Sequence, residues 1–170
     1  MGNVNARPVI VVTGTLREAA VLNHHQVEVI AGGNDPEHLR AELMERAQHA
    51  AGLVSYGMCG AIDYTLKLGT MVIGKRLTGA FHAKCDERWV EVLHELLPHA
   101  RVGTVHADGH LLSQAHDKAE RAWASAAIVA DMESHIVAEV AAHMNLPFAV
   151  LRCISDVAEV ELPPAVNVMM

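Results

Sequence analysis

Acidic residues follow three short apolar segments that have the composition of buried strands. They are Glu18, the pair Asp131 and Glu133, and Asp156. Ligands of open α/β sheets bind beyond the carboxyl ends of the strands, so we expect these carboxylates to meet at one edge of a sheet. Carboxylates in such a place can hold polar groups of a ligand and transfer protons to or from it. The pattern predicts a small-molecule site, of an enzyme rather than of a binding protein, without defining the reaction.

Other residues of the same predicted edge could contact a ligand without titrating. Thr13 and Gly14 follow the first strand, together with Arg17. The guanidinium fork of Arg17 suits a phosphate group, although a solvent-exposed position fits this residue equally well. A glycine-containing turn, Gly57–Gly60, follows the third predicted strand. Backbone without side chains lets a nucleophile or a sugar approach closely, so this turn is a candidate binding element.

Several common catalytic and binding motifs are missing. The sequence holds no GxxxxGK[ST], no GxGxxG and no GxSxG segment. Sites for nucleoside triphosphates or dinucleotides, and a serine-hydrolase site, therefore lack support. The twelve histidines include His24-His25, His106 and His110, but none stands in an HExxH frame. We interpret them as solvated or half-buried surface side chains and not as metal ligands.

Strand-like and helix-like segments alternate along the chain. Short β-branched runs predict strands, and apolar residues spaced three or four apart predict helices. Asp35 and Pro36 favour a helix start, because Asp caps a helix and Pro suits its first turn. The alternation predicts a three-layer α/β fold, with a mostly parallel mixed sheet flanked by helices. The expected strands are 9–12, 27–31, 52–56, 71–73, 102–105, 128–129 and 148–154, and the expected helices are 15–23, 36–47, 89–97, 114–124 and 136–144.

Composition limits the kind of protein further. The 170 residues suffice for one domain with a hydrophobic core. Hydrophobic residues make up 51% and charged residues 19%, which excludes a disordered chain and a coiled coil. Lys and Arg number 13 against 20 Asp and Glu, a net charge of −7, and Phe, Trp and Tyr occur twice each. Nucleic-acid binding needs basic patches or aromatic stacking surfaces, so we expect no such partner.

Cysteine usage and hydropathy predict a cytoplasmic protein. Cys59, Cys85 and Cys153 are far apart and form no CxxC motif, which favours reduced thiols. The few residues before the first strand are polar, unlike a signal peptide. No apolar run reaches the roughly 18 residues of a membrane-spanning helix. We therefore expect a soluble, intracellular protein with no integral membrane segment.

The most specific pattern lies in the last third of the chain. Asp131-Met132-Glu133-Ser134, Leu146-Pro147-Phe148 and Leu151–Asp156 follow one another in that order. Together with the segments 11–18, 55–61 and 68–73, they resemble the purine nucleoside phosphorylase and nucleosidase superfamily over about residues 8–166. Single pieces of this pattern are weak, but the ordered set is specific. The resemblance implies the nucleoside phosphorylase-like fold.

Three further segments indicate a branch of that superfamily. Gly32–Pro36, Asp131–His135 and Leu162–Ala165 resemble the hopanoid-associated phosphorylases. Members of the superfamily continue after the segment matching Asp156 with a C-terminal helix, whereas this chain has 14 further residues (170 − 156). We expect one domain over 1–170 with that helix missing or short. The apolar end Val168-Met169-Met170, together with the resemblance, predicts a homodimer.

The resemblance assigns roles to the residues around the sugar and the base. It implies that Glu133 accepts hydrogen bonds from the ribose hydroxyls, that Met132 packs against the sugar, and that Asp156 protonates N7 of the leaving purine. Negative charge grows on the purine as the bond breaks, so a proton donor assists its departure. We expect Ser155 to support Asp156. The alternative roles are a helix-start carboxylate for Glu133 and a capping residue for Asp156.

The nucleophile is less well defined by the resemblance. Glu18 matches the nucleosidase carboxylate that activates water, with an exposed helix charge as the alternative. Gly14, Gly57 and Gly60 are expected beside the substrate, with Arg17 as a candidate phosphate contact. Between these glycines, Met58 and Cys59 depart from the small residues of the superfamily. Cys59 has no histidine placed beside it by the sequence, so we expect it to pack and not to act as a nucleophile.

The branch that the chain resembles implies phosphorolysis of a purine nucleoside. A 5′-substituted adenosine such as 5′-deoxyadenosylhopane would yield adenine and a ribose 1-phosphate product. No cofactor is implied, and the co-substrate is inorganic phosphate or water. The alternatives are hydrolysis by a nucleosidase of the methylthioadenosine/adenosylhomocysteine type, an inactive nucleoside-binding homologue, and a metabolite-binding α/β domain without purine affinity.

Overall fold

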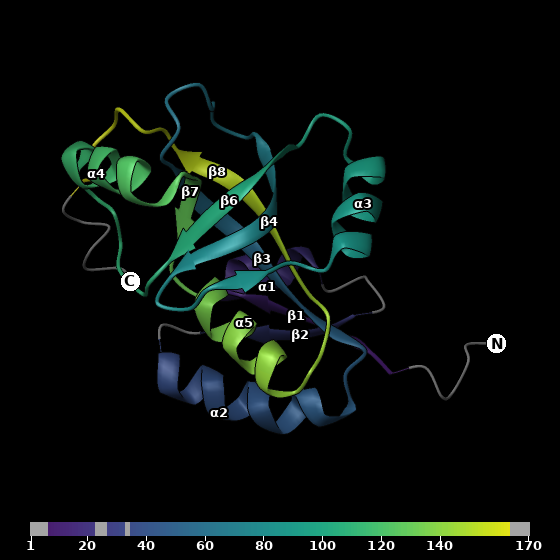
Figure 1. The fold of residues 1–170 in the computed structure, drawn as a ribbon. Helices are drawn as coiled ribbons and strands as arrows, with labels where there is room; N and C mark the ends of the chain where they lie inside the picture. The colour runs from purple at the N-terminus through teal and green to yellow at the C-terminus, as the bar shows by residue number, and fades with distance from the viewer. Residues whose placement is uncertain (1–6, 23–26, 33–34, 164–170) are drawn as a thin grey trace.

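A computed structural model describes residues 7–22, 27–32 and 35–163, in which strands and helices alternate (Figure 1). The strands are β1 (Val9–Thr13), β2 (Glu28–Ala31), β3 (Gly52–Ala61), β4 (Met71–Gly79), β5 (Ala83–Lys84), β6 (Arg101–Ala107), β7 (Ala127–Asp131) and β8 (Phe148–Asp156). The helices are α1 (Leu16–Val21), α2 (Pro36–Arg46), α3 (Glu87–Leu96), α4 (Ala115–Ser125) and α5 (Ser134–His143), with a 3-10 turn at Ala47–His49.

These strands form one mixed sheet, part of which closes on itself. The pairs β1–β2, β1–β3, β3–β8, β4–β6 and β6–β7 are parallel, while β3–β7, β4–β5 and β4–β8 are antiparallel. Because β3 pairs with both β7 and β8, the strands β3, β8, β4, β6 and β7 complete a ring (Figure 1). A closed ring leaves no unpaired edge among its strands. The sequence predicted the mostly parallel sheet but not its closure.

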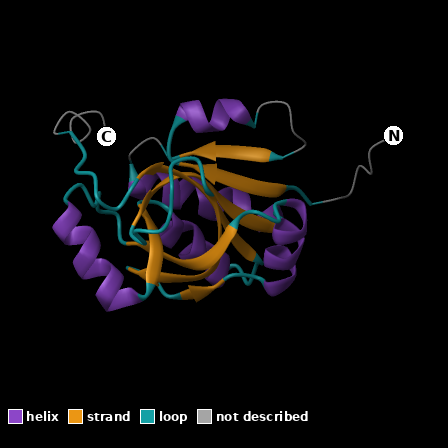
Figure 2. Cartoon of the chain, turned by 90° about the horizontal axis from the view of Figure 1, so that it is seen from above, coloured by secondary structure: helices purple, strands orange, loops and turns teal. Residues whose placement is uncertain are grey.

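Helices cover both faces of the sheet, which confirms the predicted three-layer α/β class. β2 and β3 lie on opposite sides of β1, so right-handed crossovers place α1 and α2 on opposite faces. Figure 2 shows α1 at the top, above the strands. On the other face α2 and α5 lie side by side, and Arg40 Nη2 donates to Glu139 Oε2 over 2.8 Å (Figure 1).

Side chains at the helix starts explain where the first two helices begin. Thr15 caps α1, and Glu18 closes a capping box by accepting from Thr15 N at 2.8 Å. Asp35 caps α2 by accepting from His38 N at 3.0 Å, with Pro36 in the first turn. Such caps stabilise a helix by about 1 kcal/mol each. The predicted start of α2 is therefore confirmed.

The hydrophobic core lies between the sheet and the helices. The predicted stripe of α2 is buried at Leu39 and Leu43, and Ala47 continues it in the 3-10 turn. In α5 the buried side chains include Ile136 and Val140. Burying a large aliphatic side chain contributes about 1.5–3 kcal/mol. The apolar spacing in the sequence thus identified the inner faces of both helices.

The structure corrects the turn predicted at Gly57–Gly60. β3 continues through these residues to Ala61 and pairs with β8 along the way. Gly57 has a φ of +148°, which other residues rarely adopt, so glycine allows the strand to continue here. The register against β8 shifts between Cys59 and Gly60. A strand with an irregular stretch, and not a turn, carries this part of the site.

Two other strands run further than the sequence predicts. β4 extends to Gly79 and not to 73, and β6 extends to Ala107 and not to 105. Both strands have partners on each side within the closed ring, which keeps their backbone paired beyond the apolar run. His24, His25, Gly33, Asn34 and the end 164–170 lie outside the described residues.

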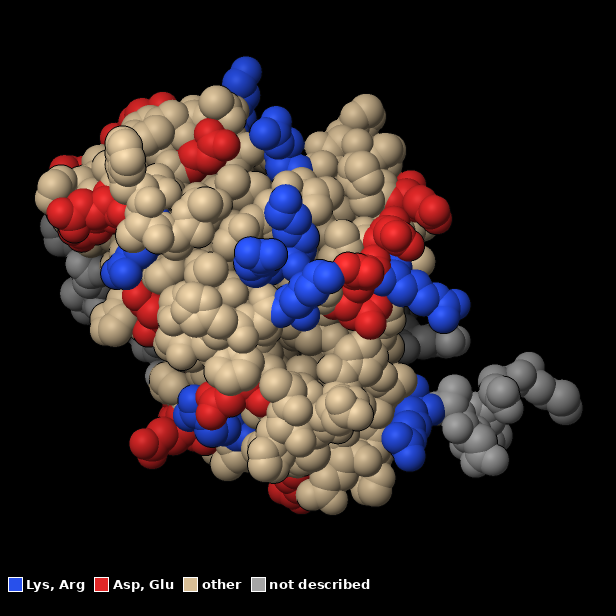
Figure 3. Space-filling model, viewed as in Figure 1, with Lys and Arg blue, Asp and Glu red and all other residues tan. Residues whose placement is uncertain are grey.

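The surface carries both signs of charge. On the face in Figure 3, basic side chains gather near the middle and acidic side chains lie on either side of them. Lys84 and Glu87 form one exposed ion pair. None of the described helices has the length and apolar character needed to cross a bilayer.

A buried ion pair ties four elements together beneath the carboxyl end of the sheet. Arg152 of β8 donates through Nε to Asp131 Oδ2 of β7 at 3.1 Å, and both side chains are only 1% exposed. Nη2 of Arg152 also lies 2.5 Å from Ser55 Oγ of β3 and 3.0 Å from Ser134 Oγ of α5. Ser134 Oγ lies 2.6 Å from Asp131 Oδ2. The network satisfies the two buried charges and sets the positions of the strand ends around them.

Replacing Arg152 tests this network. The variant Arg152→Met leaves the Asp131 carboxylate buried without its cation, so the free energy of unfolding in urea should fall by about 3–5 kcal/mol. Adding Asp131→Asn should recover part of the loss. Arg40→Met, which removes a partly exposed ion pair, serves as the control and should change stability by about 0–1 kcal/mol. A loss below 1 kcal/mol for Arg152→Met would contradict the proposed role of the network.

Candidate active site

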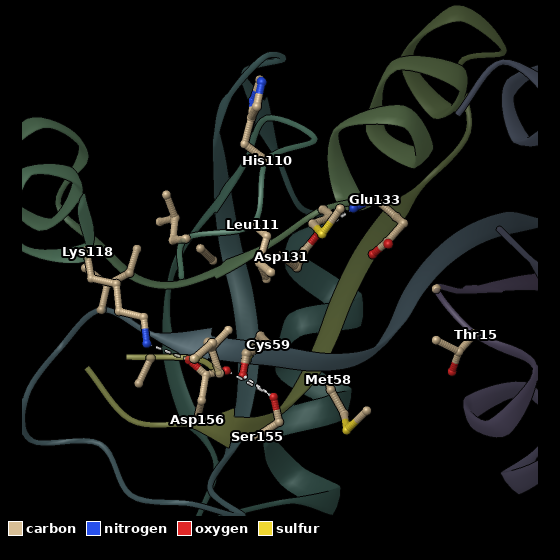
Figure 4. Close-up of a pocket in the computed structure, with 18 of the residues that line it drawn as sticks. Thr15, Met58, Cys59, His110, Leu111, Lys118, Asp131, Glu133, Ser155 and Asp156 are labelled. Atoms are coloured by element: carbon tan, nitrogen blue, oxygen red, sulfur yellow. Dashed lines mark hydrogen bonds and ion pairs between the residues drawn. The ribbon is translucent and has the colours of Figure 1, made fainter. Parts of the chain in front are cut away.

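A cavity of about 360 Å³ lies at the ends of β3, β7 and β8 and beside the start of α1 (Figure 4). Glu18, Glu133 and Asp156 all line it. The structure therefore brings together the carboxylates that the sequence placed at one edge of the sheet. Residues 110–112 and Lys118 complete its wall.

Two of these carboxylates lie directly against glycines that also line the cavity. A Cβ at Gly14 would be 3.0 Å from Glu133 Oε1, and a Cβ at Gly60 would be 2.9 Å from Asp156 Oδ2. Contacts this short force one of the two groups to move. Because Gly14 and Gly60 lack side chains, they leave the room that the two carboxylates occupy.

Glu18 is held in place by three hydrogen bonds. Its Oε2 accepts from Thr15 N at 2.8 Å and from Thr15 Oγ1 at 3.0 Å, and its Oε1 accepts from Met58 N at 2.7 Å. A carboxylate has about four acceptor positions, so one remains for a ligand or a water molecule. Gly57 lies beneath Glu18, where a Cβ would collide with Oε1, and it does not line the cavity. Gly57 therefore does not face the cavity, contrary to the contact with substrate predicted from the sequence. Instead, it leaves room for the Glu18 carboxylate.

Glu133 points into the cavity because Asp131, and not Glu133, caps the start of α5. Asp131 Oδ1 accepts from Glu133 N at 3.0 Å and from Ser134 N at 2.8 Å, whereas the Glu133 side chain makes no capping bond. Burial raises the pKa of Glu133 to about 7; the Arg152 guanidinium opposes the rise, and the charges of Asp131 and Glu18 add to it. The carboxyl group is thus left free for a ligand and titrates near neutral pH. The adjacent Met132 also lines the cavity.

Asp156 ends β8 and forms an ion pair that the sequence analysis did not anticipate. Lys118 Nζ donates to Asp156 Oδ2 at 2.6 Å, and the lysine side chain is only 1% exposed. Ser155 Oγ lies 3.2 Å from Asp156 Oδ1, as predicted, and 3.2 Å from Cys59 O (Figure 4). The aspartate is therefore held at both oxygens, strongly at one and weakly at the other.

A signal for Lys118 was present in the sequence. The inward face of α4 carries Ala115, Lys118, Ala119 and Ala122, which are less exposed than the residues on its outer face. A single lysine on a face of alanines faces the core of the protein, where a charge requires a partner. Spacing on the predicted helix could have identified it, but its partner Asp156 is 38 residues away.

Of three other positions, Arg17 takes the solvent-exposed alternative, His110 lies on the surface as interpreted, and His106 differs from the prediction. Arg17 is exposed and does not line the cavity, because it lies about 100° around the helix from Glu18 and points outward. His106 is 3% exposed and thus buried, not on the surface, and its Nε2 lies 3.1 Å from Asp108 Oδ2. His110 is exposed and lines the cavity.

Cys59 packs in the core, as expected, with 4% of its surface exposed. Burial raises the pKa of its thiol, which keeps the sulfur protonated and unreactive. Cys59, Cys85 and Cys153 are all free thiols. Met58 is 53% exposed and forms part of the cavity rim.

The charges around the cavity are mainly negative. Among the described lining residues the basic side chains are Lys118, which is bonded to Asp156, and His110. Within the described part of the chain, no three His, Cys, Asp or Glu side chains are grouped as metal ligands. Three carboxyl groups in this arrangement can accept hydrogen bonds from hydroxyl groups and exchange protons with a bound molecule.

Comparison by sequence identifies a family for almost the whole chain. Residues 1–166 match the model of the phosphorylase superfamily. A search of curated proteins finds no match.

Solved structures share the fold. An S-adenosylhomocysteine nucleosidase from Streptococcus pyogenes is 18% identical, with a TM-score of 0.78 and coverage of 93% of this chain and 87% of that one. A 5′-methylthioadenosine/S-adenosylhomocysteine nucleosidase from Campylobacter jejuni is 19% identical (TM-score 0.76; 92% and 89% covered). The futalosine hydrolase of Helicobacter pylori is 15% identical (TM-score 0.75; 88% of each chain covered). At these identities the likeness shows a common fold.

The pKa of Glu133 predicts how stability depends on pH. Its folded-state pKa of about 7 lies above the ordinary value of 4.5, so ionising the buried group costs stability as pH rises from about 4.5 to 7. Glu133→Gln removes this cost. Its free energy of unfolding should therefore exceed that of the wild type by a margin that grows over this range to at most about 3 kcal/mol.

Urea denaturation at pH 5, 6.5 and 8 measures this margin. Glu91→Gln, on the exposed face of α3, is the matched control and should stay within about 0.5 kcal/mol of the wild type at each pH. A margin for Glu133→Gln that does not change with pH would show that the group is not buried as described.

Proposed function

Because this chain belongs to the phosphorylase superfamily, we propose that it cleaves the N-glycosidic bond of a purine nucleoside. The observation that carries the proposal is the convergence of Glu18, Glu133 and Asp156 around one cavity. Each carboxylate lies against a glycine, so each has a defined place before any ligand binds. Such preorganisation is what catalysis of a charge-separating reaction requires.

Glu133 and Met132 form the sugar subsite in this proposal. An ionised carboxylate only accepts hydrogen bonds, so Glu133 suits two neighbouring hydroxyl groups of a ribose. Its position at the start of α5 supports this role, because Asp131 already caps the helix. Met132 supplies an apolar surface for the sugar ring at the same point of the cavity.

Asp156 forms the base subsite. As the bond between C1′ and N9 of the nucleoside breaks, its electron pair passes to the purine. Asp156 then donates a proton to N7, and the neutral base leaves. Leu111, Leu112 and Leu162 line the same cavity and offer apolar surface to the flat base.

Glu18 favours water as the nucleophile. One acceptor position of its carboxylate is free, so it can take a proton from a water molecule that attacks C1′. A phosphate ion would meet three carboxyl groups, and the basic lining side chains are His110 and the ion-paired Lys118. We therefore place hydrolysis ahead of the phosphorolysis expected from the sequence, with phosphate dependence decided by experiment.

The substrate proposed is an adenosine with an apolar 5′ substituent. The exposed Met58 side chain at the cavity rim supports this choice. The solved structures that share this fold are enzymes named for methylthioadenosine, S-adenosylhomocysteine or futalosine. A hopanoid substituent, a homodimer and a cytoplasmic location stay predictions from the sequence.

Adenine release tests the proposed reaction. Wild-type protein should release adenine from methylthioadenosine or 5′-deoxyadenosine, measured by liquid chromatography, in buffer without phosphate. Asp156→Asn should reduce the rate by about 100-fold, because general acid catalysis contributes about 10²–10⁴. Release only with phosphate would replace hydrolysis by phosphorolysis. Binding of the nucleoside without release of adenine would support the inactive homologue.

The rate should also depend on the ionisation of Glu133. Since only the ionised form accepts from both ribose hydroxyls and its pKa is about 7, kcat/KM should rise between pH 6 and 8 and then level off. Initial rates at subsaturating substrate over this range measure the effect. A profile that is flat from pH 6 to 8 would contradict the role of Glu133 in the sugar subsite.

A further inference from the structure

Lys118 is a buried cation whose donors are all used. Its Nζ lies 2.6 Å from Asp156 Oδ2, 3.0 Å from Val157 O and 3.1 Å from Val160 O. An ammonium group has three N–H donors, so this set is complete. Burying a lysine costs free energy unless such partners are present. The three acceptors therefore form a fitted site for this one side chain.

The two carbonyl acceptors belong to one short turn beside the cavity, directly after Asp156. Val160 N donates to Val157 O at 3.3 Å, and Leu162 N donates to Ser113 O at 2.9 Å. The turn 157–162 is thus joined to the segment just before α4, and its carbonyl groups at Val157 and Val160 accept from Lys118. Leu162 at its end lines the cavity. Lys118 consequently holds both the aspartate and the wall next to it.

The two oxygens of Asp156 are made unequal by this arrangement. Oδ2 carries the bond to Lys118 at 2.6 Å, while Oδ1 has only the longer contact of 3.2 Å with Ser155 Oγ. Gly60 lies beneath the carboxyl group, where a Cβ would come within 2.9 Å of Oδ2 and 3.2 Å of Oδ1. Oδ1 is therefore the oxygen that a bound molecule can reach.

From this geometry we propose that Lys118 is a positioning residue that presents Asp156 Oδ1 to N7 of the purine and neutralises Asp156 after proton transfer. The proposal rests on the proposed function. Asp156 first takes up a proton at Oδ1 while Oδ2 keeps its bond to Lys118. This proton passes to N7 while the C1′–N9 electron pair passes to the purine. Asp156 is left as a carboxylate, whose charge the Lys118 ammonium stabilises. The attacking water gives its proton to Glu18, and solvent carries that proton back to Asp156.

Two substrates separate this role from a structural one. 4-Nitrophenyl riboside has a leaving group that departs without a proton, whereas the purine of methylthioadenosine needs one. Lys118→Met removes the cation but keeps an unbranched side chain. Its kcat for methylthioadenosine should fall by about 100-fold, and its kcat for the nitrophenyl riboside by less than about threefold. Lys75→Met, which removes an exposed lysine of β4, is the charge-matched control and should leave both rates unchanged.

A double variant tests whether Lys118 acts through Asp156. If it does, adding Lys118→Met to Asp156→Asn should lower the residual rate by less than about threefold, because neighbouring residues that act as a unit are not additive. A full further loss in the double variant would overturn the proposal. Equal losses of Lys118→Met on both substrates would overturn it too, since that result indicates a damaged fold.

Adenine binding keeps the test separate from the proposed function. Calorimetry needs no turnover, and Lys118→Met should bind free adenine about tenfold more weakly than the wild type and Lys75→Met. If the wild type releases no adenine but shows this difference, the proposed reaction fails while the positioning role stands. Unchanged adenine affinity in Lys118→Met would overturn the positioning role.

Discussion

The buried pair of Arg152 and Asp131 is the interaction on which the rest of the site depends. It connects β8 to β7 at 3.1 Å and reaches Ser55 of β3 and Ser134 of α5 through hydroxyl groups. A buried charge without a partner is unfavourable, so the ion pair keeps the ends of β7 and β8 next to each other. Asp131 also caps α5, which leaves Glu133 one residue before the helix free for the cavity. The position of the Glu133 carboxylate and its freedom from capping bonds thus follow from one structural ion pair.

Glycines set how closely the carboxylates can approach the sheet. A Cβ at Gly60 would lie 2.9 Å from Asp156 Oδ2, and one at Gly14 would lie 3.0 Å from Glu133 Oε1, so a side chain at either position would displace the carboxylate. The carboxyl groups therefore lie deep, where burial raises the pKa of Glu133 to about 7. A group that titrates near neutral pH can bind hydroxyls in its ionised form and still be sensitive to its neighbours. The missing side chains at Gly14 and Gly60 therefore decide how deeply the two carboxyl groups lie.

The crowding of negative charge is balanced from two directions. Arg152 lies beneath the cavity and lowers the cost of ionising Glu133, while Lys118 approaches Asp156 from α4. Arg152 belongs to β8 of the closed ring of strands, whereas Lys118 belongs to α4. Each is satisfied by its own partners, which leaves the cavity with unpaired acceptors and few free donors. This balance favours a ligand rich in hydroxyl groups over an anion.

Much of this protein is determined by its sequence alone. Apolar spacing predicted the alternating α/β elements and the inner faces of α2 and α5, and the ordered acidic motifs predicted which carboxylates meet. The helix and strand signals depend on residues close in the chain, and the carboxylates follow strands whose carboxyl ends share one edge of the sheet. Closure of the strand ring, the continuation of β3 through Gly57 and the outward direction of Arg17 were decided only in three dimensions. The pairing of Lys118 with Asp156 was also decided only by the tertiary structure. Residues 38 positions apart form no local sequence pattern, and the two charges need each other only once packing has buried them.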